Sequence, residues 1–409
     1  MATIPGTHAP QQDLPVARNE RTLRSERVTL DEHGPLSLYD GLIVFITGVL
    51  MVIGVVMVYS ASVTLQGAAF DPREWWKSPL RQCVFTLAGF LTLVFVAHVD
   101  YRALSADSRW GRACAAGLWL AALGLLVAVL IPGVGSEQLG ARRWLVLLRS
   151  PFTLGFQPGE FAKVALVVCL AALLSASGFD VRRFWRGFVP ACSVGGVLIA
   201  LTGIEDFGTA ALMGVLMVAM LVLGGARWLH LGAVTMAGLA AGAALLAAEP
   251  YRVQRLKTFL SETPDPAGDG YQVMQGLIAI ASGGWWGRGL GAGIQKYGYL
   301  PQDNNDFILA VICEEFGVAG GITVIALFLC FLLRGWWISA RAPDRLGQLL
   351  ATGLTLMITL QAAFNVGVIT NSIPTKGISL PFVSAGGSGV LFLGLAVGLL
   401  AGVGRRRTT

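Results

Sequence analysis

The sequence contains ten apolar stretches, each close to the roughly 20 residues that an α-helix needs to cross the hydrocarbon core of a bilayer. The chain of 409 residues is 55% hydrophobic and 13% charged, whereas a soluble domain has about 25% charged residues. We therefore expect an all-α polytopic membrane protein with ten transmembrane helices, and soluble protein classes are excluded. The helices are expected at 42–60, 82–99, 113–132, 160–177, 188–204, 207–224, 229–248, 306–333, 347–370 and 386–404.

The stretches divide the chain into a membrane domain, residues 41–405, and two short tails. Residues 1–40 are polar, contain several prolines and carry four arginines, which favours a disordered basic cytoplasmic tail. They contain no apolar core followed by a cleavage site of small residues, so they are not a secretory signal. Residues 406–409 are expected to be a second cytoplasmic tail.

Basic residues decide the predicted orientation, because cytoplasmic loops of membrane proteins are enriched in Lys and Arg. With both termini in the cytoplasm, the inner side holds 17 Lys and Arg and the outer side 12. The net charge of +6 is too modest and too dispersed to indicate nucleic-acid binding. Both termini are therefore expected on the cytoplasmic side of the membrane.

Most of the outer basic residues lie in two loops, 133–159 and 249–305, which suggests that these loops bind anions. The second, between helices seven and eight, is the large extracytoplasmic loop, and long loops in compact proteins are usually functional or disordered. It is too short and irregular for a domain of its own. Its aromatic residues are expected to lie along the outer membrane interface: Trp285, Trp286, Tyr297 and Tyr299.

Asp306 and Glu314 are candidates for chemistry, because ionisable groups in membrane helices are costly. Asp306 stands where the large loop enters helix eight, and Glu314 is roughly 12 Å further along that helix, so the two are expected to line one cavity. Partial desolvation would raise the pKa of Asp306 and make it a better general base. The alternative is an acid favoured by the helix dipole, with Asn304 or Asn305 as the helix cap. For Glu314, a structural hydrogen bond is equally open.

Three more ionisable residues have both structural and functional interpretations. Glu160 and Lys163 are three residues apart on one face of helix four, which favours an intramembrane ion pair over a catalytic role. Asp206 lies in a very short outer turn, where a helix cap is the favoured role.

Cations on the outer side suit a pyrophosphate or carboxylate ligand, although interfacial snorkelling explains any single one of them. The candidates are Arg142, Arg143, Arg252, Arg255 and Lys376. The small-residue segment that starts at Ser384 either presents backbone N–H groups to an anion or allows close helix packing. The sequence has no zinc-ligand spacing, so no metal ligands are assigned, and neither a Walker loop nor a nucleophile elbow is present.

A series of short strings runs through the membrane domain in a fixed order. They are Val58-Tyr59-Ser60-Ala61-Ser62, Gly140-Ala141-Arg142-Arg143-Trp144, Phe156-Gln157-Pro158-Gly159-Glu160-Phe161-Ala162-Lys163, Asp206-Phe207-Gly208-Thr209-Ala210, Asp265-Pro266, Gly270-Tyr271-Gln272, Tyr299-Leu300-Pro301, Asp306-Phe307-Ile308, Glu314-Glu315, Pro374-Thr375-Lys376-Gly377 and Leu380-Pro381-Phe382-Val383-Ser384. Together they resemble the SEDS family of bacterial cell-wall polymerases, which contains FtsW, RodA and SpoVE. The resemblance extends from about residue 40 to 405.

The resemblance implies ten helices with both ends cytoplasmic, and a peptidoglycan glycosyltransferase that polymerises lipid II. It implies that Asp306 is the essential acidic residue, and that Glu314 and Arg143-Trp144 match further family positions. It also implies a class B penicillin-binding transpeptidase as partner, with other division proteins possible. One departure is Asn304-Asn305, where the family usually has His-Thr.

The interpretation that follows is glycosyl transfer on the outer face, with Asp306 as general base and the outer cations binding the pyrophosphate. Trp144, Gln272, Glu314 and the Glu160–Lys163 pair are expected to support the cavity. No cofactor is assigned, although a divalent cation such as Mg²⁺ or Mn²⁺ would suit a pyrophosphate leaving group. The Pro-Thr-Lys-Gly string favours division over RodA-like elongation. A lipid II flippase and a catalytically silent scaffold remain alternatives, since fold alone does not separate them.

Overall fold

The computed structural model describes residues 38–64, 77–138, 141–148, 154–248, 250–260, 270–296, 305–374 and 377–406. Residues 38–409 form one compact unit. The predicted N-terminal tail lies outside the described residues except at its end, where residues 38–40 belong to a helix rather than to the tail.

Helices make up almost the whole of the described chain, because a backbone in lipid must satisfy its hydrogen bonds internally. The long helices are α2 (Leu38–Thr64), α3 (Lys77–His98), α4 (Arg109–Leu130), α5 (Pro158–Ser175), α6 (Val189–Glu205), α7 (Phe207–Leu223), α8 (Trp228–Ala247), α11 (Ile308–Ala340), α12 (Arg345–Ile369) and α13 (Ser388–Arg405).

Nine helices in the described part of the chain are long and apolar enough to cross a membrane. The span that contains α6 begins at Phe184, because a π-helical turn, Phe184–Phe188, directly precedes that helix. The 17-residue α7 is shorter than that group. The predicted class, an all-α polytopic membrane protein, is confirmed, and the count of ten crossings stays a prediction.

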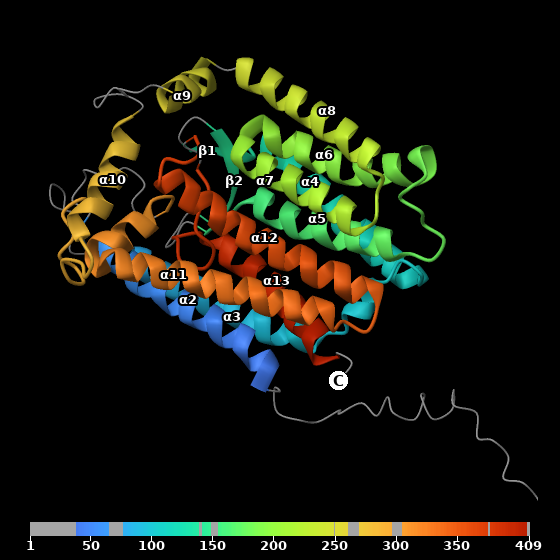
Figure 1. The fold of residues 1–409 in the computed structure, drawn as a ribbon, viewed down its shortest axis with the longest axis horizontal. Helices are drawn as coiled ribbons and strands as arrows, with labels where there is room; N and C mark the ends of the chain where they lie inside the picture. Colours follow the sequence, from blue (N-terminus) through green and yellow to red (C-terminus); the bar gives the residue numbers. More distant parts are fainter. Residues whose placement is uncertain are drawn as a thin grey trace, which may run out of the picture. The chain divides into compact units, whose positions relative to one another are not determined.

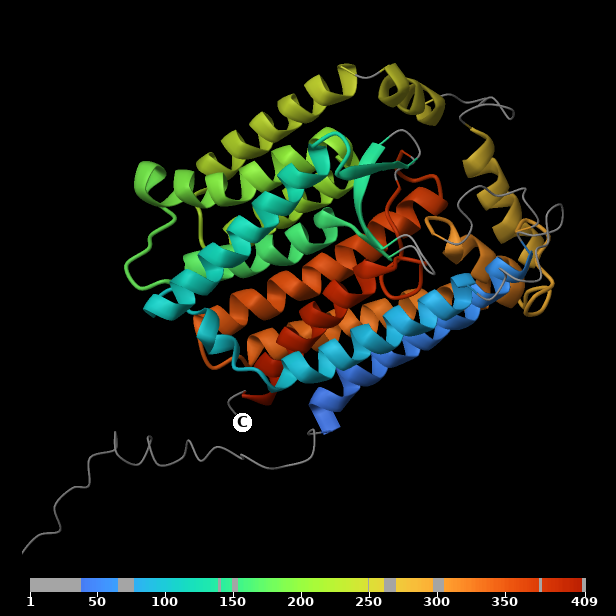
Figure 2. The same ribbon diagram turned by 180° about the vertical axis from the view of Figure 1, so that it is seen from behind.

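The helices form two neighbouring groups (Figures 1 and 2). One contains α4 to α8, and the other contains α2, α3, α11, α12 and α13. Helix α5 is almost entirely buried and packs against both groups, with α4, α6 and α7 on one side and α12 and α13 on the other. The C-terminus and the start of α2 lie at the end of the bundle opposite the strands and α9 and α10 (Figure 1).

Small residues allow close approach between α3 and α13. A methyl group at Gly394 of α13 would collide with the backbone oxygen of Gly89 in α3, and one at Gly398 would come within 2.7 Å of the Leu93 oxygen. Glycine is therefore required at this helix contact.

The loop between α4 and α5, residues 131–157, contains a three-stranded antiparallel sheet that the sequence analysis did not predict. Its strands are β1 (Gly135–Gln138), β2 (Ala141–Leu148) and β3 (Leu154–Phe156), in the order β1-β2-β3. Such short strands carry a weak sequence signal, because their stability comes from pairing with each other rather than from a long periodic pattern. The sheet places Arg142 and Arg143 on its central strand.

The large loop between α8 and α11 also contains more regular structure than the sequence indicates, namely α9 (Pro250–Leu260) and α10 (Tyr271–Gly283). Helix α10 packs against α11. Helix α11 itself is interrupted at Gly317, whose φ of 75° is in the left-handed region. The predicted single helix eight is therefore two helical segments, and the first of them follows Asp306 directly.

Candidate functional site

Asp306 lies in the turn that precedes α11, in the part of the chain between the large loop and the membrane-spanning helix. The N-cap of α11 is Phe307, and no side chain caps the helix. The alternative in which Asn305 caps this helix is therefore not observed, and Asn304 lies outside the described residues. Asp306 is a partly buried acid placed ahead of the helix.

The carboxylate of Asp306 lies close to Gly377 and to the guanidinium of Arg143. A Cβ atom at Gly377 would be 3.0 Å from Oδ2 of Asp306 and 3.7 Å from Nη1 of Arg143. Burial, and then the negative charge of Asp206, raises the pKa of Asp306 to about 7, while Arg143 and Arg255 act in the opposite direction. Asp306 is thus poised to exchange a proton near neutral pH.

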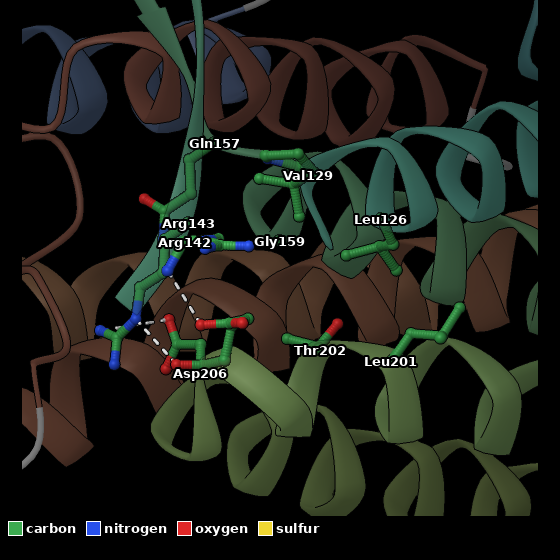
Figure 3. Close-up of a pocket in the computed structure, with 11 residues that line it drawn as sticks. Leu126, Val129, Arg142, Arg143, Gln157, Gly159, Leu201, Thr202 and Asp206 are labelled. Carbon is green, nitrogen blue, oxygen red and sulfur yellow. Dashed lines mark hydrogen bonds and ion pairs between the residues drawn. The ribbon is translucent and has the colours of Figure 1, made fainter. Parts of the chain in front are cut away.

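Arg143 is held by the turn between α6 and α7. Its Nε donates to the backbone oxygen of Glu205 at 2.9 Å, and its Nη1 lies 3.8 Å from Oδ2 of Asp206 (Figure 3). The backbone N–H of Arg142 donates to Oε2 of Glu205 at 2.8 Å. The sheet and this turn therefore fix the direction of the Arg143 guanidinium.

Asp206 caps α7, as the sequence predicts, and also faces Arg143. Its Oδ1 accepts the backbone N–H of Thr209 at 3.0 Å, and its Oδ2 accepts the Thr209 hydroxyl at 2.9 Å. A cap leaves the negative charge of the carboxylate in place, so Asp206 acts on both Arg143 and Asp306. The contact between Asp206 and Arg143 joins residues 63 positions apart, which helical spacing does not reveal.

A small pocket opens beside Arg143 and Asp206 (Figure 3). Its cationic and acidic end comes from the sheet and the α6–α7 turn, and its apolar walls include Leu126 and Val129 of α4 and Leu201 of α6. The pocket therefore has a charged end beside Arg143 and an apolar wall from α4 and α6.

Ser384 is buried, and its hydroxyl bonds within the protein. It accepts the backbone N–H of Leu380 at 2.8 Å and donates to the backbone oxygen of Asn305 at 2.6 Å. Helix α13 begins only at Ser388, so Ser384 is not at the helix N-terminus. The observed role of Ser384 is to join its loop to the turn of Asp306, and its predicted binding of pyrophosphate stays untested.

Glu160 and Lys163 form the predicted intramembrane ion pair on α5, with Nζ 2.8 Å from Oε1. Lys163 also donates to Oε1 of Gln361 in α12 at 2.6 Å, and Gln361 donates to the backbone oxygen of Ser379 at 2.9 Å. Lys163 is 2% exposed, so the pair does not line an open cavity. It links α5 to α12 and to the loop that follows Gly377.

Glu314 is fully buried and holds the large loop rather than an open cavity. Its carboxylate accepts the backbone N–H groups of Ile294 and Gln295, at 2.8 Å for Ile294. Glu314 was expected to line a cavity shared with Asp306. In the structure its carboxylate instead accepts hydrogen bonds from the backbone N–H groups of the folded loop.

A buried ion pair beside Glu314 was missed from the sequence. Nζ of Lys296 lies 2.7 Å from Oε1 of Glu315 and 2.9 Å from Oγ of Ser60, whose hydroxyl donates to Glu315 at 2.8 Å. Ser60 and Glu315 are 255 residues apart, so local spacing could not have paired them. The one available signal was a lysine in an otherwise Gly-rich part of the loop.

The other predicted residues lie around this site or outside the described part. The ring of Trp144 covers the backbone of Gly155, where a Cβ atom would be 2.9 Å from a ring carbon. Gln272 lies on α10 and Arg255 on α9, and Arg255 is close enough to influence Asp306. Lys376 lies outside the described residues, as does the side chain of Arg252.

Among the described residues there is no group of three or more His, Cys, Asp or Glu side chains that could hold a metal ion. A divalent cation held by one or two carboxylates together with the pyrophosphate stays a prediction from the sequence.

These features define a class: polytopic helical membrane proteins with an acid and a set of cations at one end of the bundle. The chain belongs to the FtsW/RodA/SpoVE family, described as cell cycle proteins, whose sequence profile matches residues 40–409. The family predicted from the short strings is confirmed.

Two relatives and one solved structure illustrate the similarity. Stage V sporulation protein E of Bacillus subtilis is 38% identical over 367 residues, which cover 90% of this chain and 97% of that protein. A probable peptidoglycan glycosyltransferase FtsW of Nitrosococcus halophilus is 41% identical, with 84% of this chain and 86% of that protein covered. A chain of a solved peptidoglycan synthase complex that coordinates polymerization and crosslinking has a TM-score of 0.69 and 29% identity, over 89% of this chain and 97% of that one.

Proposed function

We propose that this chain is a peptidoglycan glycosyltransferase that polymerises lipid II into β-1,4 glycan strands and releases undecaprenyl pyrophosphate. The observation that carries the proposal is the Asp306 carboxylate, whose pKa is raised to about 7, beside the held guanidinium of Arg143. Relatives named probable peptidoglycan glycosyltransferase FtsW, which this chain matches over most of their length, support the same activity.

In the proposed step, Asp306 removes the proton of the GlcNAc 4-hydroxyl of the acceptor. The hydroxyl oxygen forms a bond to C1 of the lipid-linked MurNAc, and the bond from C1 to the pyrophosphate oxygen breaks. The electron pair leaves with undecaprenyl pyrophosphate, and the proton stays on Asp306 until solvent removes it. Attack opposite the leaving group converts an α-linked donor into a β-linked product. General-base assistance of this kind contributes roughly 10²–10⁴-fold.

The leaving group gains negative charge as its bond to C1 breaks, so fixed cations lower the barrier. Arg143 is the best-placed cation, because its Nε is held by Glu205 while its Nη1 faces the space beside Gly377. Arg255 contributes positive potential at Asp306. Arg142, Lys376 and Arg252 are proposed as further pyrophosphate ligands.

We place the site on the outer face of a bacterial cytoplasmic membrane, with both termini in the cytoplasm, because the basic residues are enriched on the side of the termini. The proposed partner is a class B penicillin-binding transpeptidase, which the similarity to a solved peptidoglycan synthase complex supports. Relatives named FtsW favour septal wall synthesis over elongation. A tagged chain would then concentrate at the division site, and signal spread along the side wall would favour elongation.

The test of the activity is the identity of the product. The purified chain with its transpeptidase partner, blocked by a β-lactam, is incubated with labelled lipid II. The proposal predicts glycan strands that a muramidase digests, together with free undecaprenyl pyrophosphate. Lipid II that changes leaflet in proteoliposomes without forming strands would instead indicate a flippase, and neither result from a folded complex would indicate a scaffold.

A further inference from the structure

The turn that carries Asp306 and the loop that follows Gly377 lie side by side without pairing as strands. The amide of Asn365 in α12 bridges them: its Nδ2 donates to the backbone oxygen of Asp306 at 2.8 Å and to that of Ile378 at 2.8 Å. Asn365 has no exposed surface. Its Oδ1 has no hydrogen-bond partner among the described residues, so its two N–H groups orient the amide.

The chemistry of this contact is specific to a side-chain amide. One amide nitrogen carries two protons, so it can satisfy two carbonyl oxygens from a single neutral atom. A hydroxyl offers only one proton, and an aliphatic side chain offers none. Replacement of Asn365 would therefore remove its bonds to Asp306 and Ile378 and leave the bond from Ser384 to the backbone oxygen of Asn305 as the remaining link, among the described residues, between the loop and this turn.

A second amide on α12 shows which part of this arrangement is special to Asn365. Gln361 lies one helical turn earlier on the same face and holds Ser379 of the same loop, but its bonds go to Ser379 and Lys163 and not to Asp306. Asn365 is thus the α12 amide, within the described residues, that contacts both sides of the gap in which Asp306 faces Gly377.

We propose that Asn365 is a positioning residue for the reaction: its amide sets the distance between the Asp306 turn and the 377–384 loop, and thereby the direction of the Asp306 carboxylate relative to Arg143. The role in the reaction rests on the proposed function. The contact itself rests only on the geometry.

The test compares wild type with Asn365→Leu, which keeps the number and branching of the side-chain heavy atoms and removes both donors. Asn365→Gln keeps two donors at a different reach and serves if the leucine variant does not fold. The control is Thr355→Val. Thr355 is a buried residue of α12 whose hydroxyl, among the described residues, donates to Ala351 of the same helix. Folding is followed by thermal unfolding in the complex with the transpeptidase.

The first measurement is the rate of lipid II polymerisation against substrate concentration and pH. A misplaced base lowers kcat by about 10–100-fold with little change in KM. Water admitted around Asp306 should also move the acidic limb of the pH profile to lower pH. An Asn365→Leu complex with the wild-type kcat and pH profile would overturn the proposal, as would equal losses in Thr355→Val.

A second measurement does not need activity. A carbodiimide modifies protonated carboxyl groups, so the pH midpoint of Asp306 modification, followed by mass spectrometry, reports the environment of this carboxylate. We expect the midpoint to fall in Asn365→Leu and to stay unchanged in Thr355→Val. If wild type makes no strands, the proposed function fails, and this midpoint still decides the positioning role: an unchanged midpoint in Asn365→Leu overturns it.

Discussion

The raised pKa of Asp306 predicts an unusual dependence of the polymerisation rate on pH. An ordinary aspartate titrates near pH 3.9. With a general base of that kind, the polymerisation rate would not change with pH down to about pH 5. With a pKa of about 7, Asp306 is half protonated at neutral pH, and kcat/KM should fall about tenfold for each unit below that value. From pH 8 to pH 5 the expected loss is on the order of 100-fold.

Two substitutions should move this acidic limb in opposite directions. Asp206→Asn removes a negative neighbour that raises the pKa of Asp306, so the limb should shift to lower pH. Arg143→Gln removes a cation that lowers it, so the limb should shift to higher pH. The position of the limb can be read even when the maximal rate falls, so the role of Arg143 toward pyrophosphate does not obscure the comparison.

The assay is the initial rate of strand formation by the complex with its blocked transpeptidase, in nanodiscs, from pH 5 to pH 9 at constant ionic strength. Asp180→Asn is a matched control, because Asp180 is exposed and follows the far end of α5. A limb near pH 4 in wild type would refute the reasoning, as would shifts of the same sign in Asp206→Asn and Arg143→Gln.

Two further predictions concern held charges. Arg143→Lys keeps the positive charge but loses the Nε–H that donates to the backbone oxygen of Glu205. Strand formation should show a fall in kcat of about 10²-fold, and thermal unfolding should show that the complex remains folded. A rate within twofold of wild type would contradict the role assigned to Arg143. Lys296→Met leaves the buried Glu315 without its cation and should destabilise the protein by about 3–5 kcal/mol in denaturant unfolding, with partial recovery in Lys296→Met/Glu315→Gln. Equal stability of the single and double variants would show that the pair is not coupled.

The sequence was sufficient for the features that depend on local pattern. Nine of the ten predicted apolar stretches coincide with a helix to within about five residues, because the requirement for about 20 apolar residues acts on the stretch itself. The exception is 306–333, where α11 is interrupted at Gly317 and ends at Ala340. The Glu160–Lys163 pair was accessible for the same reason, since both residues lie on one helix face. The Asp206 cap belongs to this group as well.

What the sequence did not reveal depends on contacts between distant segments. The ion pair of Lys296 with Glu315 and the contact of Arg143 with Asp206 form only after the large loop and the sheet have folded against the helices. The interruption of α11 at Gly317 is of the same kind, because the loop backbone around Trp285 packs closely against that glycine and leaves no room for a Cβ atom. A glycine within an apolar run does not by itself predict a break.

The measurement that tests the central claim most directly is strand formation by Asp306→Asn, which replaces the carboxylate with an amide of the same shape. With lipid II and the blocked transpeptidase partner, the account predicts a loss of roughly 10²–10⁴-fold relative to wild type, with normal thermal unfolding and full activity in Asp180→Asn. Glycan strands formed by Asp306→Asn at the wild-type rate would contradict the assignment of Asp306 as the general base.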